Sequence, residues 1–390
     1  MNNRAIRKND LIFVLPGIPL YKSGGHTIIY ELARLAQQDG YKVKLVFVKD
    51  AYREIYRLTH DEKIAQYIRN RKFSHGLYDR LVNTKLGIVF LVKILRTIMG
   101  IKYSDNIEGL NIKFVGNFSK FTLNSSIIIS SCYLTTTILG NIPITNEATL
   151  YNFIQNQEDS ADITTDLWAI AKKSYEYPMK KIVINGREYK RFMEEQPIYL
   201  PIGINDKFKV QKPPEDRNPK RVLFFLAQPL FKGAEYAIAA INLIHDSDES
   251  IEIYSFGSYV GDNIPRSLNH LGAISDGDLV DLYNSCSIFV LPSLVEGVPA
   301  PGLEAMSCGC ALISTSNGGI NEYATNGIDS IIVPVKDSNA IAQAVVKLVN
   351  ENKLRIKLAH NGIETSKEFS YKRMYATFKR EILDVRRSSK

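Results

Sequence analysis

Apolar and polar positions follow one another along this chain in blocks that predict a repeated strand–helix order. The first block has an apolar run at residues 11–15, a helical pattern at residues 28–38 and a second apolar run in "GYKVKLVFV". Short apolar runs that alternate with helical segments are typical of a parallel sheet, because parallel strands need long crossover connections. Further runs in "NIKFVG", "SSIIISSCY", "ATLYNFIQ" and "KKIVING" continue this order. The first half of the chain is therefore predicted to be a Rossmann-like domain.

The order is interrupted once and then begins again. "KVQKPPEDRNPKR" is charged and rich in proline, which favours a linker at residues 206–219, and the strand and helix patterns resume at "RVLFFLA". We expect residues 1–205 to form an N-terminal domain, residues 220–365 a C-terminal Rossmann-like domain and residues 366–390 a final helix. The predicted fold class is α/β, with two parallel sheets that face each other across a cleft, where ligands of such sheets bind.

Composition and charge narrow the class of partner. The chain has 390 residues, of which 45% are hydrophobic and 23% charged, an ordinary globular composition that suits two domains. Its net charge of +8 permits an anionic partner. No zinc-finger, RNA-recognition or helix-turn-helix signature accompanies this charge, so we expect no nucleic acid partner.

The start of the chain does not predict a signal peptide, and the cysteines do not predict a zinc site. "LIFVLPGIPL" breaks at Pro16 and Gly17, so it predicts a first strand and not a signal peptide. The cysteines lack the spacing of a zinc site. We expect small buried thiols in a reducing compartment, namely Cys132, Cys286, Cys308 and Cys310.

One segment favours contact with an anionic membrane surface. "KLGIVFLVKILRTIMGIKY" (residues 85–103) is too short in its uncharged part to cross a bilayer. Wound as a helix, it places Lys85, Lys93 and Arg96 along one narrow side, with apolar residues around the rest. A basic amphipathic helix lies in the interface of an anionic membrane, and "RNRKF" upstream adds charge, so residues 69–103 are predicted to associate with a membrane. The alternative is a helix packed on a core with a solvated basic stripe.

Loops that follow predicted strands carry the candidate chemistry. In "KSGGHT", Gly24 and Gly25 stand directly before a helix, where paired glycines let the backbone approach an anion; the alternative is a tight turn. In "LAQPLFKGAEYA", Lys232 opens a helix and is placed to neutralise a phosphate; the alternative is a solvated lysine. In "LGAISDGDLVDLYNSC", the backbone at Ile274 is placed to pair with a base edge, whereas Ser275 or its neighbour is placed to cap a helix, and periodicity leaves both open.

Two carboxylates flank a stiff turn in "EGVPAPGLEAMSCG". Glu296 precedes a loop stiffened by prolines, and Glu304 is expected in the first turn of the helix that follows. Pro301 and Gly302 prepare a helix start whose amides point at a phosphate, with the helix dipole favouring negative charge. Helix stabilisation also explains Glu304, but it does not explain Glu296. Because two carboxylates would repel a bare diphosphate, we expect them to bind hydroxyl groups, one on a ribose and one on a sugar.

On these motifs the chain resembles the family 4 retaining glycosyltransferases of the GT-B fold. "EGVPAPGLEAMSCGCALISTSNGGINEY" resembles the family's E-x7-E region with the glycine-containing segment after it, and "FKGAEYAIAAI" resembles its KG helix start. "SGGHTIIYELARLAQQDGYKVKLV" resembles its N-terminal glycine loop, and "LPIGINDKF" resembles its approach to the interdomain linker. The resemblance covers nearly the whole chain. It implies a final helix that packs back toward the N-terminal domain, and a reaction that needs no metal or other cofactor.

The resemblance also implies roles for single residues. Glu304 would hold the ribose of a nucleotide-sugar, and Glu296 would contact hydroxyls of the transferred sugar. Lys232 would act with Glu296 in catalysis by adding charge at the diphosphate, and Ile274 would frame the base. The diphosphate would meet the helix start and the glycine loop, namely Pro301, Gly302, Leu303, Gly24 and Gly25.

Two positions depart from the family's pattern. Gln228 stands where the family usually has an arginine before the KG lysine, and Arg221 is too early on its strand to replace it. Many members also have a histidine near the transferred sugar, but no histidine follows "IIISSCY" or "TLYNFIQ" here. "NFIQNQEDS" occupies the corresponding loop. Its candidates for contact with sugar or acceptor are Gln155, Gln157 and Glu158.

The sequence thus predicts a retaining glycosyltransferase that moves a sugar from a nucleotide-diphosphate-sugar to a hydroxyl acceptor. The expected acceptor is a lipid-linked or cell-envelope glycan, and the expected location is the cytoplasm, peripheral on the inner face of the plasma membrane. Another GT-B enzyme, such as a sugar-nucleotide epimerase, is the alternative within the enzymes. A non-catalytic nucleotide-sugar-binding subunit is the alternative outside them, because the arginine and the histidine are missing.

Overall fold

The computed structural model describes two compact units. Its described residues are 10–17, 23–62, 64, 109–118, 123, 125–144, 148–156, 168–261 and 263–385. The described residues up to Leu200, together with those from Tyr375 onward, form unit 1, and residues from Pro201 to Met374 form unit 2. The predicted membrane-associating segment, residues 69–103, lies outside the described residues.

Unit 1 is built on a seven-stranded sheet in the order β3-β2-β1-β4-β5-β6-β7, and every neighbouring pair is parallel. Its strands are β1 (Asp10–Leu15), β2 (Lys42–Val48), β3 (Asn111–Val115), β4 (Ile127–Ser130), β5 (Thr149–Ile154), β6 (Lys180–Val183) and β7 (Ile198–Tyr199). Its helices are α1 (Gly24–Gln38), α2 (Ala51–Thr59), α6 (Tyr133–Gly140), α7 (Trp168–Ser174) and α8 (Gly186–Arg191), with a 3-10 turn at Met193–Glu195.

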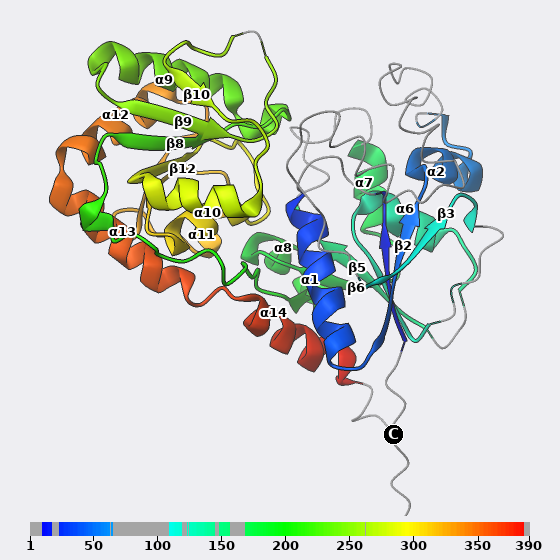
Figure 1. The fold of residues 1–390 in the computed structure, drawn as a ribbon. Coiled ribbons are helices and arrows are strands. Elements are labelled where there is room, and N and C mark those ends of the chain that lie inside the picture. Colours follow the sequence, from blue (N-terminus) through cyan, green and yellow to red (C-terminus); the bar gives the residue numbers. More distant parts are fainter. Residues whose placement is uncertain are drawn as a thin grey trace, which may run out of the picture. The chain divides into compact units, whose positions relative to one another are not determined.

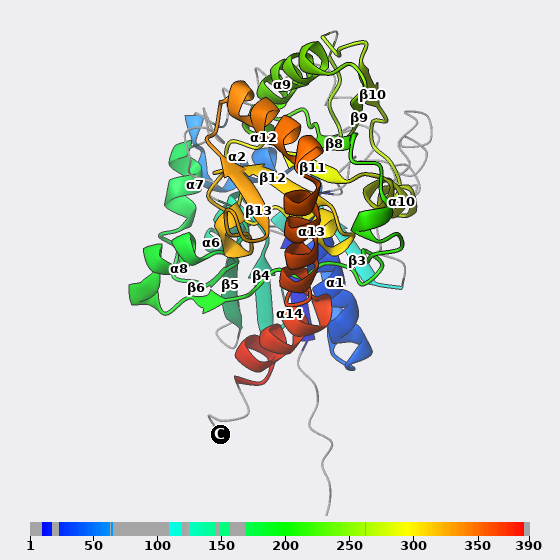
Figure 2. The ribbon, with the colours of Figure 1, turned by 90° about the vertical axis from the view of Figure 1, so that its left-hand side faces the viewer.

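Alternate side chains of the central strands pack on opposite faces of this sheet. Ile12 and Val14 of β1 are buried with residues of α2, α6 and α7. Phe13, between them, points the other way and stacks on Phe378 with ring centroids 6.1 Å apart. Figures 1 and 2 show α1 on the opposite side of the sheet from α2, α6 and α7. Strands covered on both faces need apolar residues at every position, which explains the unbroken runs in the sequence.

Unit 2 repeats this plan with a six-stranded parallel sheet in the order β10-β9-β8-β11-β12-β13. Its strands are β8 (Arg221–Phe225), β9 (Glu252–Phe256), β10 (Leu268–His270), β11 (Ile288–Leu291), β12 (Ala311–Thr315) and β13 (Ser330–Val333). Its helices are α9 (Ala234–Ser247), α10 (Asp276–Ser285), α11 (Ala300–Ser307), α12 (Ser338–Asn350) and α13 (Asn352–Ser366), with 3-10 turns at Pro214–Asp216, Leu230–Lys232 and Ile320–Glu322.

The helices of unit 2 also cover both faces of the sheet. Figure 1 shows α9 and α12 side by side on one face, with α10 and α11 on the other. The first face is closed by an aliphatic core that includes Ile241, Val290 and Val345. The second face has an aromatic cluster in which Tyr283 packs edge-on against Phe289 and Phe256, with centroids 5.4 and 5.8 Å apart.

The charged segment predicted as a linker, residues 206–219, belongs to unit 2 and packs within it. Arg217 is buried and donates to the carbonyls of Tyr283 and Cys286 at 3.1 and 3.0 Å, and also to the carbonyl of Cys308. The Gln211 amide donates to the side chain of Asn284 at 2.7 Å. A guanidinium with several donors satisfies carbonyls at the ends of α10 and α11, where the helix dipole favours a cation.

The last helix, α14 (Tyr371–Phe378), continues into a π-helical turn at Lys379–Leu383, and Figure 2 shows it directly after α13. From Tyr375 on, the chain is held by unit 1. Asp39 accepts hydrogen bonds from Tyr375 at 3.1 Å and pairs with Lys379 at 2.6 Å. Met374 and the residues of α14 before it belong to unit 2.

The predicted α/β class with two parallel sheets is confirmed. The four cysteines are free thiols, and three of them are buried as expected. Cys132 is only partly buried, because it is the N-cap residue of α6, where the chain turns from strand to helix. No helix within the described residues is long and apolar enough to cross a membrane.

Candidate functional site

The strand order of unit 2 brings two distant predicted residues together. The sheet changes direction between β8 and β11, which lie side by side although whole elements separate them in sequence. Ligands of doubly wound sheets bind at the carboxyl ends of the strands at such a switch point. Lys232 follows β8 and Glu296 follows β11, so the two side chains meet at this edge.

Lys232 and Glu296 form an ion pair, with Lys232 Nζ 2.7 Å from Glu296 Oε1. The side chain of Lys232 is 22% exposed and that of Glu296 is 9% exposed, so the pair is partly shielded from water. The ammonium group also lies 5.3 and 5.8 Å from the ring centroids of Phe231 and Phe225. A lysine at this edge can exchange its carboxylate partner for a phosphate oxygen, since both are anionic acceptors.

Gly233 allows the loops after β8 and β11 to close on each other. Its φ is +67°, and a Cβ there would overlap the carbonyl oxygen of Pro292. The Leu294 amide donates to the Phe231 carbonyl at 2.7 Å, which ties the two loops one residue before Lys232. The glycine of the KG motif is therefore required by the packing of the loops that position the lysine.

Glu296 is fixed from its other side by the loop after β12. Its amide donates to the carbonyl of Asn317 at 3.0 Å. Gly319 lies so close to Gly297 that a Cβ at position 319 would overlap the Gly297 carbonyl oxygen. Three consecutive exit loops are thus joined, and they hold the Glu296 backbone between them.

Glu304 lies deeper in its helix than the sequence suggested. The helix α11 begins at Ala300 and has no acidic residue in its first turn, so the expected first-turn position of Glu304 is wrong. The physical reason is that proline is tolerated in the first turn of a helix, and Pro301 falls inside α11 rather than before it. Stabilisation by the helix dipole fades within one turn, which weakens the purely structural explanation of Glu304.

Gly302 is needed for a contact inside the protein. A Cβ at this position would overlap the hydroxyl of Tyr323, which donates to the Pro299 carbonyl at 2.8 Å. Pro301 has no N–H, and the Gly302 amide donates to the Pro299 carbonyl at 3.2 Å. The side chain of Leu303 is fully buried, so only its backbone can meet a ligand.

Two buried tyrosines belong to this site, although the sequence analysis did not single them out. Tyr283 is 0% exposed, and its hydroxyl faces both the Pro301 carbonyl and Glu304. Tyr323 is 6% exposed and holds Pro299. A signal was present, because a tyrosine in an apolar helix pattern must find a partner for its hydroxyl when it is buried.

Ile274 lies in the loop after β10, directly before α10, and is partly buried. Ser275 next to it is the N-cap of α10, and its hydroxyl accepts from the Asp278 amide at 3.2 Å. The cap is thus Ser275, and the backbone before it remains the candidate for a base contact.

Unit 1 brings together two more predicted residues at its own carboxyl edge. The helix α1 begins at Gly24. A Cβ on Gly25 would stand 2.9 Å from Gln155 Oε1, whereas one on Gly24 would meet nothing within 4 Å. Gln155 follows β5, and its amide group donates to the Ser131 carbonyl at 3.2 Å. Gln157 and Glu158 lie outside the described residues.

Gln228, at the position of the family's arginine, has a local partner. Its side-chain oxygen accepts from the Val260 amide at 3.0 Å, which joins the loops after β8 and β9. Arg221 stands at the amino end of β8, where it pairs with Glu252 at 3.3 Å and lies over the ring of Tyr254. A strand of this length separates Arg221 from the exit loop by roughly 13 Å.

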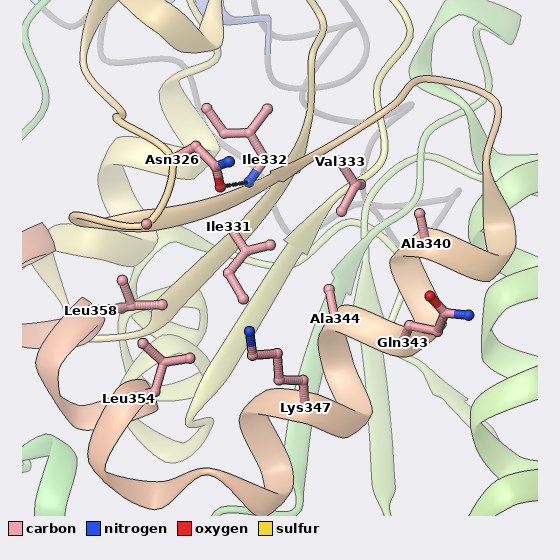
Figure 3. A pocket seen from close by; sticks show the side chains of 11 residues that line it. Asn326, Ile331, Ile332, Val333, Ala340, Gln343, Ala344, Lys347, Leu354 and Leu358 are labelled. Carbon is pink, nitrogen blue, oxygen red and sulfur yellow. Dashed lines mark hydrogen bonds between the residues drawn. The ribbon is translucent and has the colours of Figure 1, made fainter.

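Unit 2 also has a cavity of about 490 Å³ between β13, α12 and α13. Figure 3 shows apolar side chains such as Ile331 and Leu358 around it, with the amine of Lys347 pointing toward Ile331. It contains none of the predicted site residues, and we assign it no part in the site. Among the residues that the structure describes, no group of three His, Cys, Asp or Glu side chains is placed to hold a metal ion.

Comparison with known proteins shows which families contain sequences similar to unit 2. Residues 219–351 match the family described as Glycosyl transferases group 1, and this range contains Lys232, Glu296 and Glu304. Unit 2 is similar to the group 1 glycosyl transferases. The match covers about a third of the chain and does not extend into unit 1.

Two curated relatives share part of the chain. An N,N'-diacetylbacillosaminyl-diphospho-undecaprenol alpha-1,3-N-acetylgalactosaminyltransferase of Campylobacter jejuni is 34% identical over 103 residues, which are 26% of this chain and 27% of that protein. The capsular polysaccharide biosynthesis glycosyltransferase CapM of Staphylococcus aureus is 26% identical over 140 residues, 34% of this chain and 37% of that protein. The chain thus spans well under half the length of these relatives.

Solved structures match over nearly the full length. Anabaena HepE, solved in complex with UDP and glucose, has a TM-score of 0.68 at 11% identity, covering 95% of this chain and 98% of that one. At this identity the likeness shows the fold. The predicted GT-B fold class, with two Rossmann-like domains, is confirmed.

Proposed function

We propose that this protein is a retaining glycosyltransferase that moves a sugar from a nucleotide-diphosphate-sugar to a hydroxyl acceptor. The ion pair of Lys232 and Glu296 carries this proposal, because it stands at the switch point of unit 2 inside the region similar to glycosyl transferases. A cation able to meet a diphosphate thus lies 2.7 Å from a carboxylate able to accept from sugar hydroxyls.

In this proposal the donor replaces the Lys232–Glu296 contact. Lys232 turns to the diphosphate, and Glu296 accepts hydrogen bonds from hydroxyls of the transferred sugar. Glu304 holds the ribose, and the backbone near Ile274 meets the base. Gly24 and Gly25 approach the diphosphate from unit 1. The protein acts mainly by positioning its two substrates and by stabilising the charge of the leaving group.

The chemical step keeps the anomeric configuration. The acceptor oxygen forms its bond to the anomeric carbon on the face from which the diphosphate leaves. The bond from that carbon to the diphosphate oxygen breaks, and this oxygen takes the acceptor proton. No side chain is needed as a nucleophile, and Lys232 stabilises the negative charge that develops on the diphosphate without a metal ion.

The names of the relatives support a lipid-linked or cell-envelope glycan as the acceptor, since one acts on a diphospho-undecaprenol-linked sugar and another in capsular polysaccharide synthesis. The basic segment at residues 69–103 supports, from its sequence alone, the further proposal that the reaction occurs at an anionic membrane surface on the cytoplasmic side. The double variant Lys93→Gln/Arg96→Gln is expected to bind anionic vesicles less well than wild type. Lys172→Gln/Lys173→Gln, which removes two exposed lysines of α7, is the matched control, and equal binding by all three proteins would contradict a membrane role for this segment.

A thermal-shift screen against nucleoside diphosphates and nucleotide-sugars tests the donor assignment. At least one nucleotide-sugar is expected to raise the Tm, and stabilisation by none of them would contradict the proposal. The stabilising donor is then incubated with sugar acceptors, and the anomeric configuration of the product is read by NMR. Epimerised donor without acceptor would favour an epimerase, and binding without any turnover would favour a non-catalytic subunit.

A further inference from the structure

Two tyrosine hydroxyls hold the start of α11. Tyr283 donates to the Pro301 carbonyl at 3.2 Å, and Tyr323 donates to the Pro299 carbonyl at 2.8 Å. Of the two hydroxyls, that of Tyr283 lies within hydrogen-bond distance of a carboxylate, 3.5 Å from Glu304 Oε2, whereas Glu304 acts on Tyr323 through its charge and not through a hydrogen bond. The two tyrosines therefore share one structural role, and Tyr283 has an additional contact with a predicted ligand-binding group.

The position of the Tyr283 hydroxyl is fixed by the packing of its ring. The ring meets Phe289, Phe256 and Phe208 edge-on, with centroids 5.4, 5.8 and 6.1 Å away. Its backbone carbonyl is held by the buried Arg217 at 3.1 Å. A ring enclosed in this way cannot swing, so the hydroxyl stays within reach of Glu304.

The hydroxyl remains a donor at every working pH. Burial and, secondarily, the neighbouring Glu304 carboxylate raise the pKa of Tyr283 well above its ordinary value. Its single proton is shared between the Pro301 carbonyl and Glu304 Oε2. Glu304 is only 6% exposed, so a donor on one of its oxygens has a strong effect on how the carboxylate is oriented.

We propose that Tyr283 is a positioning residue for Glu304, and that its hydroxyl holds this carboxylate in the orientation that accepts the two ribose hydroxyls of the nucleotide. The inference rests on the proposed function, in which Glu304 binds the ribose. Tyr283 does not touch the nucleotide itself. It acts through Glu304, and Tyr323 lacks this effect although it holds the same turn.

Calorimetric titration with UDP and 2',3'-dideoxy-UDP tests this role of Tyr283. If the thermal-shift screen selects GDP, the titration uses GDP and 2',3'-dideoxy-GDP instead. Wild type is expected to bind the ribose form about tenfold more tightly, the size expected for hydrogen bonds to a charged group. In Tyr283→Phe this ratio is expected to fall to about threefold. Tyr323→Phe removes a hydroxyl from the same turn and is expected to keep the wild-type ratio.

A structural defect alone would weaken both nucleotides equally and would leave their ratio unchanged. An unchanged ratio in Tyr283→Phe would therefore overturn the inference while leaving the proposed function in place. A wild-type ratio near one would show that Glu304 does not bind the ribose hydroxyls. The inference about Tyr283 depends on that binding and would be overturned with it. Failure of wild type to bind either nucleotide would count against the proposed function itself and would overturn the inference as well.

A second variant covers the case in which Tyr283→Phe folds poorly. Replacement of Tyr283 by p-aminophenylalanine keeps the shape of the ring and retains an N–H donor where the O–H was. This protein is expected to restore the tenfold preference for the ribose form. Loss of the preference in a protein with wild-type Tm would overturn the inference.

Discussion

Units 1 and 2 share one architecture, but their carboxyl edges carry different chemistry. The edge of unit 2 has charged groups that already contact each other or a buried hydroxyl, namely Lys232, Glu296 and Glu304. The described part of the unit 1 edge has the glycine start of α1 and the neutral amide of Gln155. The same fold thus offers charge on one sheet and close backbone approach on the other. Under the proposed function, unit 2 holds the donor through charge and hydroxyl contacts, and unit 1 contributes by letting its backbone come near.

The largest effect is expected on the charged edge. Lys232→Met removes the cation that stabilises the leaving diphosphate, and the expected loss in kcat is about 100-fold to 1,000-fold, as for removal of a donor to a developing anion. Steady-state kinetics with the identified donor measure it. Lys232→Arg keeps the charge and serves as the control. A Lys232→Met enzyme with wild-type kcat would show that the charge of unit 2 is not used in the chemical step.

A smaller effect is expected on the packing that supports this edge. Gly302→Ala forces a Cβ into the Tyr323 hydroxyl and is expected to lower the free energy of unfolding by about 1–2 kcal/mol, because overpacking outweighs the gain in helix propensity. Denaturant unfolding measures the change. In Gly302→Ala/Tyr323→Phe the nearest atom to the new Cβ is the ring carbon at 3.2 Å, so the double variant is expected to be more stable than Gly302→Ala alone. Additive losses would show that the two residues do not share this contact.

A substitution at the carboxyl edge of unit 1 is expected to have a weaker effect on activity. Gly25→Ala places a Cβ 2.9 Å from Gln155 Oε1, and the glutamine must shift away from the start of α1. We expect the KM for the donor to rise about threefold, which corresponds to well under one tenfold step in affinity. Gly24→Ala meets no protein atom within 4 Å, so it separates crowding of the ligand from crowding of Gln155. Equal effects of the two substitutions would mean that the contact with Gln155 has no bearing on the site.

The smallest effect is expected from metal removal. The charge of the diphosphate is met by Lys232 in the proposal, so dialysis against EDTA should leave kcat within about twofold of its value in added Mg²⁺. Activity measured in both buffers checks this. A loss restored by Mg²⁺ or Mn²⁺ would contradict a metal-independent reaction.

The fold could be predicted because both sheets are parallel and covered on both faces. Runs such as residues 11–15 are apolar at every position, and this pattern has few interpretations other than a buried strand. The KG lysine and the two glutamates could be singled out because they follow such strands. The boundary of α11 could not be predicted, since proline is allowed on either side of a helix start.

Contacts between residues that are distant along the chain could not be predicted from the sequence. The pairing of Lys232 with Glu296 depends on β8 and β11 being neighbours, which a strand pattern alone does not state. The approach of Gln155 to Gly25 likewise depends on the order of the unit 1 strands. For Tyr283 the helix pattern indicated that a buried hydroxyl needs a partner, but it could not name Pro301 or Glu304 as that partner.

The most direct test of the account compares a nucleotide-sugar with its nucleoside diphosphate by calorimetric titration, in wild type and in Glu296→Gln. Under the proposed function, Glu296 contacts the transferred sugar and the rest of the unit 2 edge holds the nucleotide. We expect Glu296→Gln to bind the nucleoside diphosphate at least as tightly as wild type, because Lys232 is released from its ion pair, and to lose the additional affinity that the sugar provides. Unchanged affinity for both ligands, or an equal loss for both, would contradict the assignment of the sugar to Glu296.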